Sequence, residues 1–221
     1  MKIAKLKIKN YDIQARYFRR AQIIGSLLRL APFVRMVGIN GSLPMGKATK
    51  ESDIDFFIVT KKKRLWTGRF FAILFVQAIG LRRYGKKIAG RICLNRYQTE
   101  DYLIIHPQDK KNAFHHSFMI PLWQADNLYG KFIKANKWFS RYGYKFKNQL
   151  PDQNLFWNFL DRSVQFIGEL IFDFFLGDWG EKKLGQYQKE RIRRDPRTKK
   201  SPKGSIFVSD KELRFHPPKK P

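Results

Sequence analysis

Two acidic side chains, Asp53 and Asp55, stand at the start of a strongly apolar segment that continues through residues 56–59. Successive side chains of a strand point to opposite faces, so these two carboxylates point the same way. At about 7 Å apart along a strand they repel each other unless a cation lies between them. Mg²⁺, a hard cation that prefers oxygen ligands, is the ion that this pattern indicates. The alternative is an exposed pair, salt-bridged to Lys47 or Lys50.

A glycine-serine pair, Gly41-Ser42, precedes Asp53 by a spacer of ten residues and follows the apolar segment 37–39 after one residue, Asn40. The backbone N–H groups and the hydroxyl of such a tight loop can hold phosphate oxygens. Without the aspartates, the pair would indicate only an ordinary turn. Carboxylates that hold a metal beside a phosphate-binding loop are typical of phosphoryl or nucleotidyl transfer.

At this spacing, Gly41-Ser42 followed by Asp53-Ile54-Asp55 resembles the signature of the DNA polymerase beta-like nucleotidyltransferase superfamily. The resemblance covers about residues 12–105. Segments 92–95 and 132–138 look similar to a little-characterised bacterial branch of that superfamily, which carries a helical C-terminal half.

The resemblance implies a mixed sheet with helices on one side, a nucleoside triphosphate as donor and two Mg²⁺ ions. Asp53 and Asp55 would ligate the metal ions, while Gly41 and Ser42 would hold the β- and γ-phosphates. The implied reaction moves a nucleoside monophosphate to an acceptor that the sequence does not identify.

The sequence departs from the superfamily at one catalytic position, where Asn95 stands in place of the usual third carboxylate. An amide oxygen can ligate a metal, but it carries no charge and cannot act as a base. Three alternatives follow: a substitute carboxylate such as Glu100 or Asp101, a site for one metal ion, or a catalytically degenerate domain. The degenerate domain would bind RNA or DNA through its basic surface.

Hydrophobic periodicity predicts a core of alternating helices and strands. The expected elements are helix 11–31, strand 33–39, strand 53–60, helix 64–81, strand 91–97 and strand 102–105. Residues 109–140 and 153–177 are predicted to be helical. The predicted fold class is therefore α/β (α+β), with a nucleotidyltransferase-like core at 1–105, a helical region at 106–180 and a basic, partly flexible tail at 181–221.

The net charge is extreme, because 45 Lys and Arg residues stand against 18 Asp and Glu residues and give +27. The tail at 181–221 contributes 14 basic and 5 acidic residues. Such a charge attracts polyanions without choosing among them, so RNA or DNA is a candidate partner beside the nucleotide. A generally basic surface without a specific partner is the alternative.

No signal peptide is evident at the N-terminus, and we expect a cytoplasmic protein. The single cysteine, Cys93, excludes an internal disulfide framework, and no disulfide-linked partner is expected. The apolar residues of 155–179, namely Phe159, Val164, Phe166, Ile167, Leu170, Ile171 and Phe174, indicate an amphipathic helix. Packing against the rest of the protein is the favoured interpretation, and contact with a membrane surface ranks last.

Overall fold

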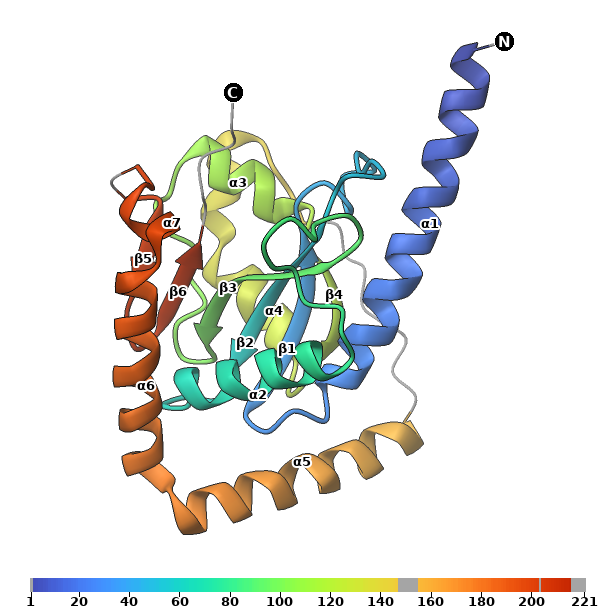
Figure 1. Ribbon diagram of the computed structural model, residues 1–221. Helices are drawn as coiled ribbons and strands as arrows, with labels where there is room; N and C mark the ends of the chain where they lie inside the picture. The colour runs from blue at the N-terminus through green and yellow to red at the C-terminus, as the bar shows by residue number, and fades with distance from the viewer. Residues whose placement is uncertain (1, 147–154, 203, 216–221) are drawn as a thin grey trace.

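A computed structural model describes residues 2–146, 155–202 and 204–215 of the chain (Figure 1). The elements follow in the order α1 (Lys2–Leu28), β1 (Val34–Asn40), β2 (Ile54–Thr60), α2 (Leu65–Ala78), β3 (Ile92–Thr99), α3 (Lys110–Ser117), β4 (Ile120–Gln124), α4 (Leu128–Ala135), the 3₁₀-helix η1 (Lys137–Tyr142), α5 (Leu155–Phe175), α6 (Gly177–Arg194), α7 (Pro196–Lys199), β5 (Ile206–Val208) and β6 (Glu212–Phe215).

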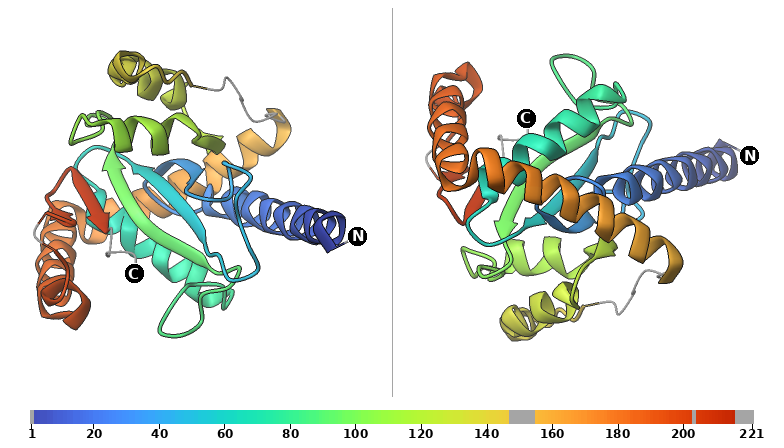
Figure 2. Two further views of the ribbon diagram at one scale, coloured as in Figure 1. Left: turned by 90° about the horizontal axis from the view of Figure 1, so that it is seen from above. Right: turned by 90° about the horizontal axis from the view of Figure 1, so that it is seen from below.

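Within the described residues, the six strands form one sheet in the order β4-β1-β2-β3-β6-β5. The central strands β2 and β3 are parallel, and α2 connects them, whereas the other neighbouring pairs are antiparallel. The prediction of an α+β fold with a mixed sheet is therefore confirmed. The helices, however, cover both faces of the sheet rather than one (Figure 2).

The two faces are covered by different helices because the central strands are apolar on both sides. On β2, Ile54, Phe56 and Ile58 pack into a core shared with α1, α2 and α6. Phe57 and Val59 point the opposite way, into a second core shared with α3, α4 and η1. Asp55 shares this second face but lies at its open end, before the apolar packing begins.

Two predictions within residues 102–140 are wrong. Residues 102–105 do not pair as a strand, because side chains satisfy their backbone: Asn136 donates to the Leu103 carbonyl and accepts from the Ile105 N–H. The segment 109–140 is not wholly helical, because Ile120–Gln124 adds strand β4 to the edge of β1. Periodicity does not separate so short an apolar run from a helix.

The described residues beyond 181 form regular elements that pack on the rest of the protein. Helix α6 packs against α2, and β5 and β6 extend the sheet from β3. The buried Leu213 joins the first core, and Glu212 forms a buried ion pair with Arg96. The sheet thus takes strands from all three predicted ranges, because the edges of β1 and β3 supply the hydrogen-bond partners that these distant segments need.

Helix α5 also differs from the prediction. Val164, Phe166, Ile167, Leu170, Ile171 and Phe174 do not pack on the protein, because each is more than half exposed; the side chain of Phe159 lies outside the described residues. The polar residues Gln165 and Glu169 face inward instead, where they bind backbone and side-chain groups of the sheet. Among the described residues, no helix combines the length and apolar character required to span a bilayer.

Candidate functional site

The two predicted carboxylates meet at the open end of the sheet. Asp53 directly precedes β2, and Asp55 is its second residue. One side-chain oxygen of each and the sulfur of Cys93 lie within 4.8 Å of one another. Cys93 stands beside Asp55 because the two residues are register partners in the parallel pair β2–β3. The structure therefore brings Asp53 and Asp55 together, as their spacing predicts.

Gly41 closes this carboxylate cluster from the β1 side. It follows Asn40, which pairs with Asp55 across the β1–β2 ladder, and its φ of +76° lies in the left-handed region that favours glycine. A Cβ on Gly41 would lie 2.3 Å from Oδ2 of Asp55, a distance that no side chain tolerates. The backbone of the Gly41-Ser42 turn can thus approach the carboxylate only because residue 41 has no side chain.

Asp53 pairs with an arginine that the sequence analysis did not select. Nη1 of Arg83 lies 2.6 Å from Oδ2 of Asp53 and donates to the sulfur of Cys93 at 3.5 Å. The alternative pairing with Lys47 or Lys50 is absent from the ion pairs of the described residues, where Lys50 lies 3.8 Å from Glu51. Arg83 lies thirty residues from Asp53, and no local pattern indicates the pairing.

Asn95 contacts Asp55 directly, because its side-chain amide donates to Oδ1 of Asp55 at 2.6 Å. The β2–β3 register shifts between Phe56 and Phe57, so Asn95 is the unpaired residue of a bulge. In this orientation the amide holds the carboxylate instead of adding a third negative charge.

Glu100 and Asp101 are not substitute carboxylates. Both lie beyond the far end of β3, roughly 20 Å along the strand from Cys93. There Glu100 accepts the backbone N–H of Lys62, and Asp101 lies 3.8 Å from Lys211.

Residues 20–137, more than half of the chain, match the family described as a nucleotidyltransferase domain. The chain belongs to this family, within the polymerase beta-like superfamily. The match confirms the predicted superfamily and extends beyond residue 105 to include β4 and α4. No curated protein and no solved structure gave a significant match.

The donor set of this nucleotidyltransferase domain fits a hard divalent cation, the kind of metal that nucleotidyltransferases typically use. Asp53 and Asp55 supply two converging carboxylates, and Asp55 lies directly against the backbone of the Gly41 turn. Cys93 is a poor ligand, because burial and the charges of Asp55 and Asp53 raise the pKa of its thiol well above the usual range. Hard cations also prefer oxygen to sulfur ligands, so the carboxylate oxygens suit such an ion better than the thiol does.

A buried network of polar side chains adjoins Asn40, the residue before the Gly41 turn. Nδ2 of Asn40 lies 2.7 Å from Nδ1 of His116, whose Nε2 lies 3.2 Å from Arg96. Arg96 in turn donates to Glu212 at 2.6 Å. Burial lowers the pKa of Arg96 to about 10, although the charge of Glu212 opposes this shift. This network of side chains links β6 to Asn40, the residue before Gly41. The sequence analysis missed the network because its residues come from four separate elements.

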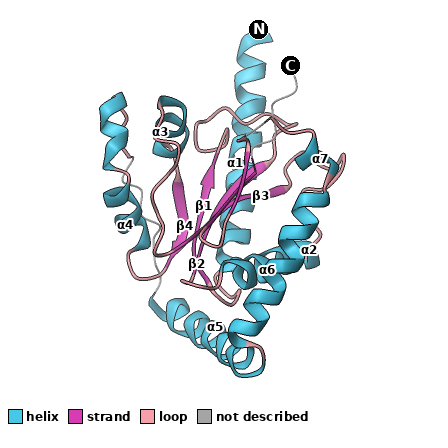
Figure 3. Cartoon of the chain, turned by 90° about the vertical axis from the view of Figure 1, so that its left-hand side faces the viewer, coloured by secondary structure: helices cyan, strands magenta, loops and turns pink. Residues whose placement is uncertain are grey.

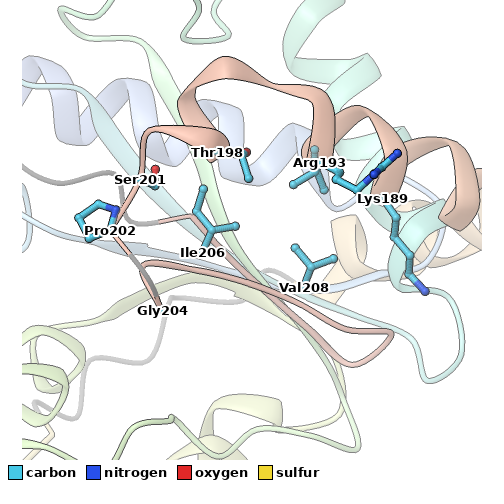
Figure 4. A pocket seen from close by; sticks show the side chains of 9 residues that line it. Lys189, Arg193, Thr198, Ser201, Pro202, Gly204, Ile206 and Val208 are labelled. Atoms are coloured by element: carbon cyan, nitrogen blue, oxygen red, sulfur yellow. The ribbon is translucent and has the colours of Figure 1, made fainter.

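A pocket of about 440 Å³ lies between α6, α7 and β5 (Figure 4). Its lining combines basic, hydroxyl and apolar side chains, namely Lys189, Ile192, Arg193, Thr198, Ser201, Pro202, Ile206 and Val208, with Gly204. The charges at its rim are already paired, because Lys189 lies 2.7 Å from Asp210 and Arg193 lies 2.8 Å from Glu190. The pocket shares no residue with the nucleotidyltransferase site.

Proposed function

We propose that the protein is a Mg²⁺-dependent nucleotidyltransferase that moves a nucleoside monophosphate from a nucleoside triphosphate to an unidentified acceptor. The observation that carries the proposal is the convergence of Asp53 and Asp55 beside the Gly41 turn. Two like charges this close in a half-buried position are costly unless a cation is bound between them. Membership of the nucleotidyltransferase family supports the same reaction class.

In this proposal each residue has a distinct role. Asp53 and Asp55 hold Mg²⁺, which, when bound, supplies positive charge that neutralises the phosphate oxygens. Gly41 and Ser42 bind the β- and γ-phosphates through backbone N–H groups and a hydroxyl. The acceptor attacks the α-phosphorus, the bond to the bridging oxygen breaks, and pyrophosphate leaves.

Asn95 and Arg83 tune the charge of the proposed site. Asn95 orients Asp55 through the 2.6 Å hydrogen bond, and it acts as a positioning residue that does not replace the missing carboxylate. Arg83 holds Asp53 and adds a positive charge close to where phosphate oxygens would bind. With two carboxylates, one Mg²⁺ ion is well ligated, and a second ion would depend on oxygens of the substrate.

The test is incubation of the purified chain with labelled nucleoside triphosphates, Mg²⁺ and a panel of RNA, DNA and protein acceptors. We expect label transfer that disappears in Asp53→Asn and Asp55→Asn. Asp101→Asn, at the far end of β3, is the matched control and should retain transfer. No transfer above the level of the aspartate variants, across the whole panel, would contradict the proposal.

A second candidate is a degenerate nucleotidyltransferase domain that binds RNA or DNA without catalysis. The hydrogen bond from Asn95 to Asp55 favours this candidate, because the uncharged Asn95 amide occupies the place of a third charged ligand. This candidate predicts nucleic-acid affinity that falls steeply with salt and is unchanged in Asp55→Asn. A flat salt dependence, or no binding at all, would exclude it.

A further inference from the structure

Helix α5 is attached to the protein by its polar residues. Gln165 donates to the carbonyls of Ala31 and Val34, and Glu169 accepts from the Phe33 N–H at 2.9 Å and from Arg35 at 2.7 Å. Asp173, one turn further on, pairs with Arg64 at 2.9 Å. Although burial opposes the charge of Glu169, Arg35, the Phe33 N–H and Lys61 lower its pKa. These contacts fix which face of the helix points outward.

The outward face of α5 is apolar along its described length. Its exposed residues from 164 onward are Val164, Phe166, Ile167, Leu170, Ile171, Phe174 and Phe175, with Phe166 64% and Phe174 80% exposed. Every charged side chain of 163–175 points inward, so no charge interrupts this face. A helix that only covered a core would bury these side chains, and contiguous exposed patches of this kind mark interaction surfaces. We call this set of residues the α5 face.

Basic and aromatic residues border the α5 face. Trp179, just beyond the end of α5, is 62% exposed, and the ammonium of Lys183 lies 5.9 Å from its ring centroid. Lys182 is also exposed on α6, as are Lys62 and Lys63 in the turn after β2 that contains the contacts to α5. Exposed tryptophan and lysine beside an apolar helix face are typical of helices that lie in a membrane interface.

Charge distinguishes the possible occupants of the α5 face. A second copy of the chain would bring another +27 and the same basic border against the first. An anionic lipid surface accepts the apolar side chains between its acyl chains and attracts the lysines at its headgroups. We propose that α5 lies in the interface of an anionic bilayer and holds the protein at that surface without spanning it.

This placement orients the rest of the molecule. Glu169 binds at the start of β1 and the end of β2, whereas Asp55 lies near the start of β2. The contact helix and the carboxylate cluster are therefore at opposite ends of the sheet, about 20 Å apart along β2. Figure 2 shows α5 crossing the lower end of the molecule. A bilayer bound to α5 leaves the carboxylate cluster facing water.

The test is co-sedimentation of the full chain with phosphatidylcholine vesicles that contain, or lack, phosphatidylglycerol. We expect binding that requires the anionic lipid, weakens with salt and falls at least tenfold in a Phe166→Gln/Phe174→Gln variant. Tyr187→Gln/Phe207→Gln is the matched control, because both residues are exposed outside the α5 face, and it should bind like the wild type. Unchanged melting temperatures verify that the variants fold.

A spectroscopic readout places the contact on the border of the α5 face. Vesicle binding should shift tryptophan emission to shorter wavelengths in the wild type, and Trp179→Phe should remove that shift. Absence of wild-type co-sedimentation, equal binding to vesicles of either composition, or undiminished binding by the Phe166→Gln/Phe174→Gln variant each overturns the proposal. The proposal is also overturned if the wild type is a dimer in solution and the Phe166→Gln/Phe174→Gln variant is a monomer, because the α5 face would then bind a second copy.

Discussion

Acidic side chains gather at both ends of β2, and the two groups differ in what surrounds them. At the start of the strand, Asp53 and Asp55 face each other with one guanidinium, that of Arg83, beside Asp53. At the far end, where α5 passes below the sheet (Figure 3), Glu169 and Asp173 form ion pairs with Arg35, Lys61 and Arg64. Lys61 lies within 4 Å of both carboxylates, 3.4 Å from Glu169 and 3.9 Å from Asp173.

The comparison shows how charge balance separates a reactive group from a structural one. Each carboxylate at the α5 end is paired with cationic side chains, so it is already neutralised and serves to fasten a helix. The two carboxylates at the start of β2 converge on each other, and a bound cation would remove the repulsion between them. Substitution of Glu169 or Asp173 is therefore expected to affect stability, whereas substitution of Asp53 or Asp55 is expected to affect metal binding and chemistry.

Asp55→Asn gives the largest expected effect. Because one of two converging carboxylates is removed, we expect nucleotidyl transfer to fall about 10²- to 10³-fold, the size typical of a lost electrostatic contact in a reacting site. The melting temperature should not fall, because the substitution also removes a like-charge repulsion. Transfer assays and thermal unfolding in the absence of Mg²⁺ measure the two quantities. A variant with normal transfer would remove Asp55 from the site.

Glu169→Gln tests the other end of β2. It leaves Arg35 without its buried carboxylate, and breaking such a pair costs about 3 kcal/mol of unfolding free energy. Denaturant titration measures this cost. Glu190→Gln is the matched control, because its ion pairs with Arg193 and Arg194 are on the surface and contribute little. Equal effects of the two substitutions would mean that α5 is not fastened by Glu169.

The same residue predicts a pH dependence. The pKa of Glu169 is lowered below its ordinary value of 4.5 in the folded protein. Its contribution to stability is therefore present above pH 4.5 and is lost as the pH falls through the folded-state pKa. Unfolding curves collected between pH 7 and pH 3 should lose less stability in Glu169→Gln than in the wild type. Parallel pH profiles would contradict this assignment.

Gly41→Ala separates backbone strain from a side-chain clash. The new Cβ would meet Oδ2 of Asp55 at 2.3 Å in a conformation with positive φ, and we expect a loss of about 2 kcal/mol. Gly46→Ala has a similar φ of +70° but nothing within 4 Å, so it should cost only the strain, about 1 kcal/mol. Chemical denaturation of both variants gives the difference. Equal losses of unfolding free energy in the two variants would show that the Gly41 turn can shift to accommodate a side chain.

Asn95→Asp restores the carboxylate that the superfamily usually has. Without metal it places a third negative charge beside Asp55, so we expect a small loss of stability, about 1 kcal/mol. Mg²⁺ should raise the melting temperature of this variant more than that of the wild type. Thermal scans with and without Mg²⁺ test the claim, and an identical Mg²⁺ response in both proteins would contradict a metal at this position.

Cys93→Ser has the smallest expected effect. Because the thiol stays protonated, its loss should change transfer less than about twofold. A large loss of transfer, or a shift in metal preference away from soft ions such as Cd²⁺, would show that the sulfur is a ligand after all.

Local spacing was sufficient to predict that the two carboxylates converge beside the Gly41 turn. Asp53 and Asp55 are two residues apart on one strand, and the pleat alone sends both side chains the same way. Gly41-Ser42 and the following strand are neighbours in sequence and in the sheet, so the turn had to lie close to Asp55. The superfamily resemblance followed from these local relations, and the family match confirms it.

The sequence alone therefore determined the order of the core strands and the pair of carboxylates, because both depend on residues close together along the chain. Tertiary structure decided which distant groups complete them: Arg83 beside Asp53, Glu212 beneath Arg96, and β4 and β6 on the free edges of the sheet. Tertiary structure also decided which face of α5 is exposed to solvent. Periodicity reveals that a helix has two unlike faces, but only its contacts decide that Glu169 and Phe172 turn inward, whereas Phe166 and Phe174 turn outward.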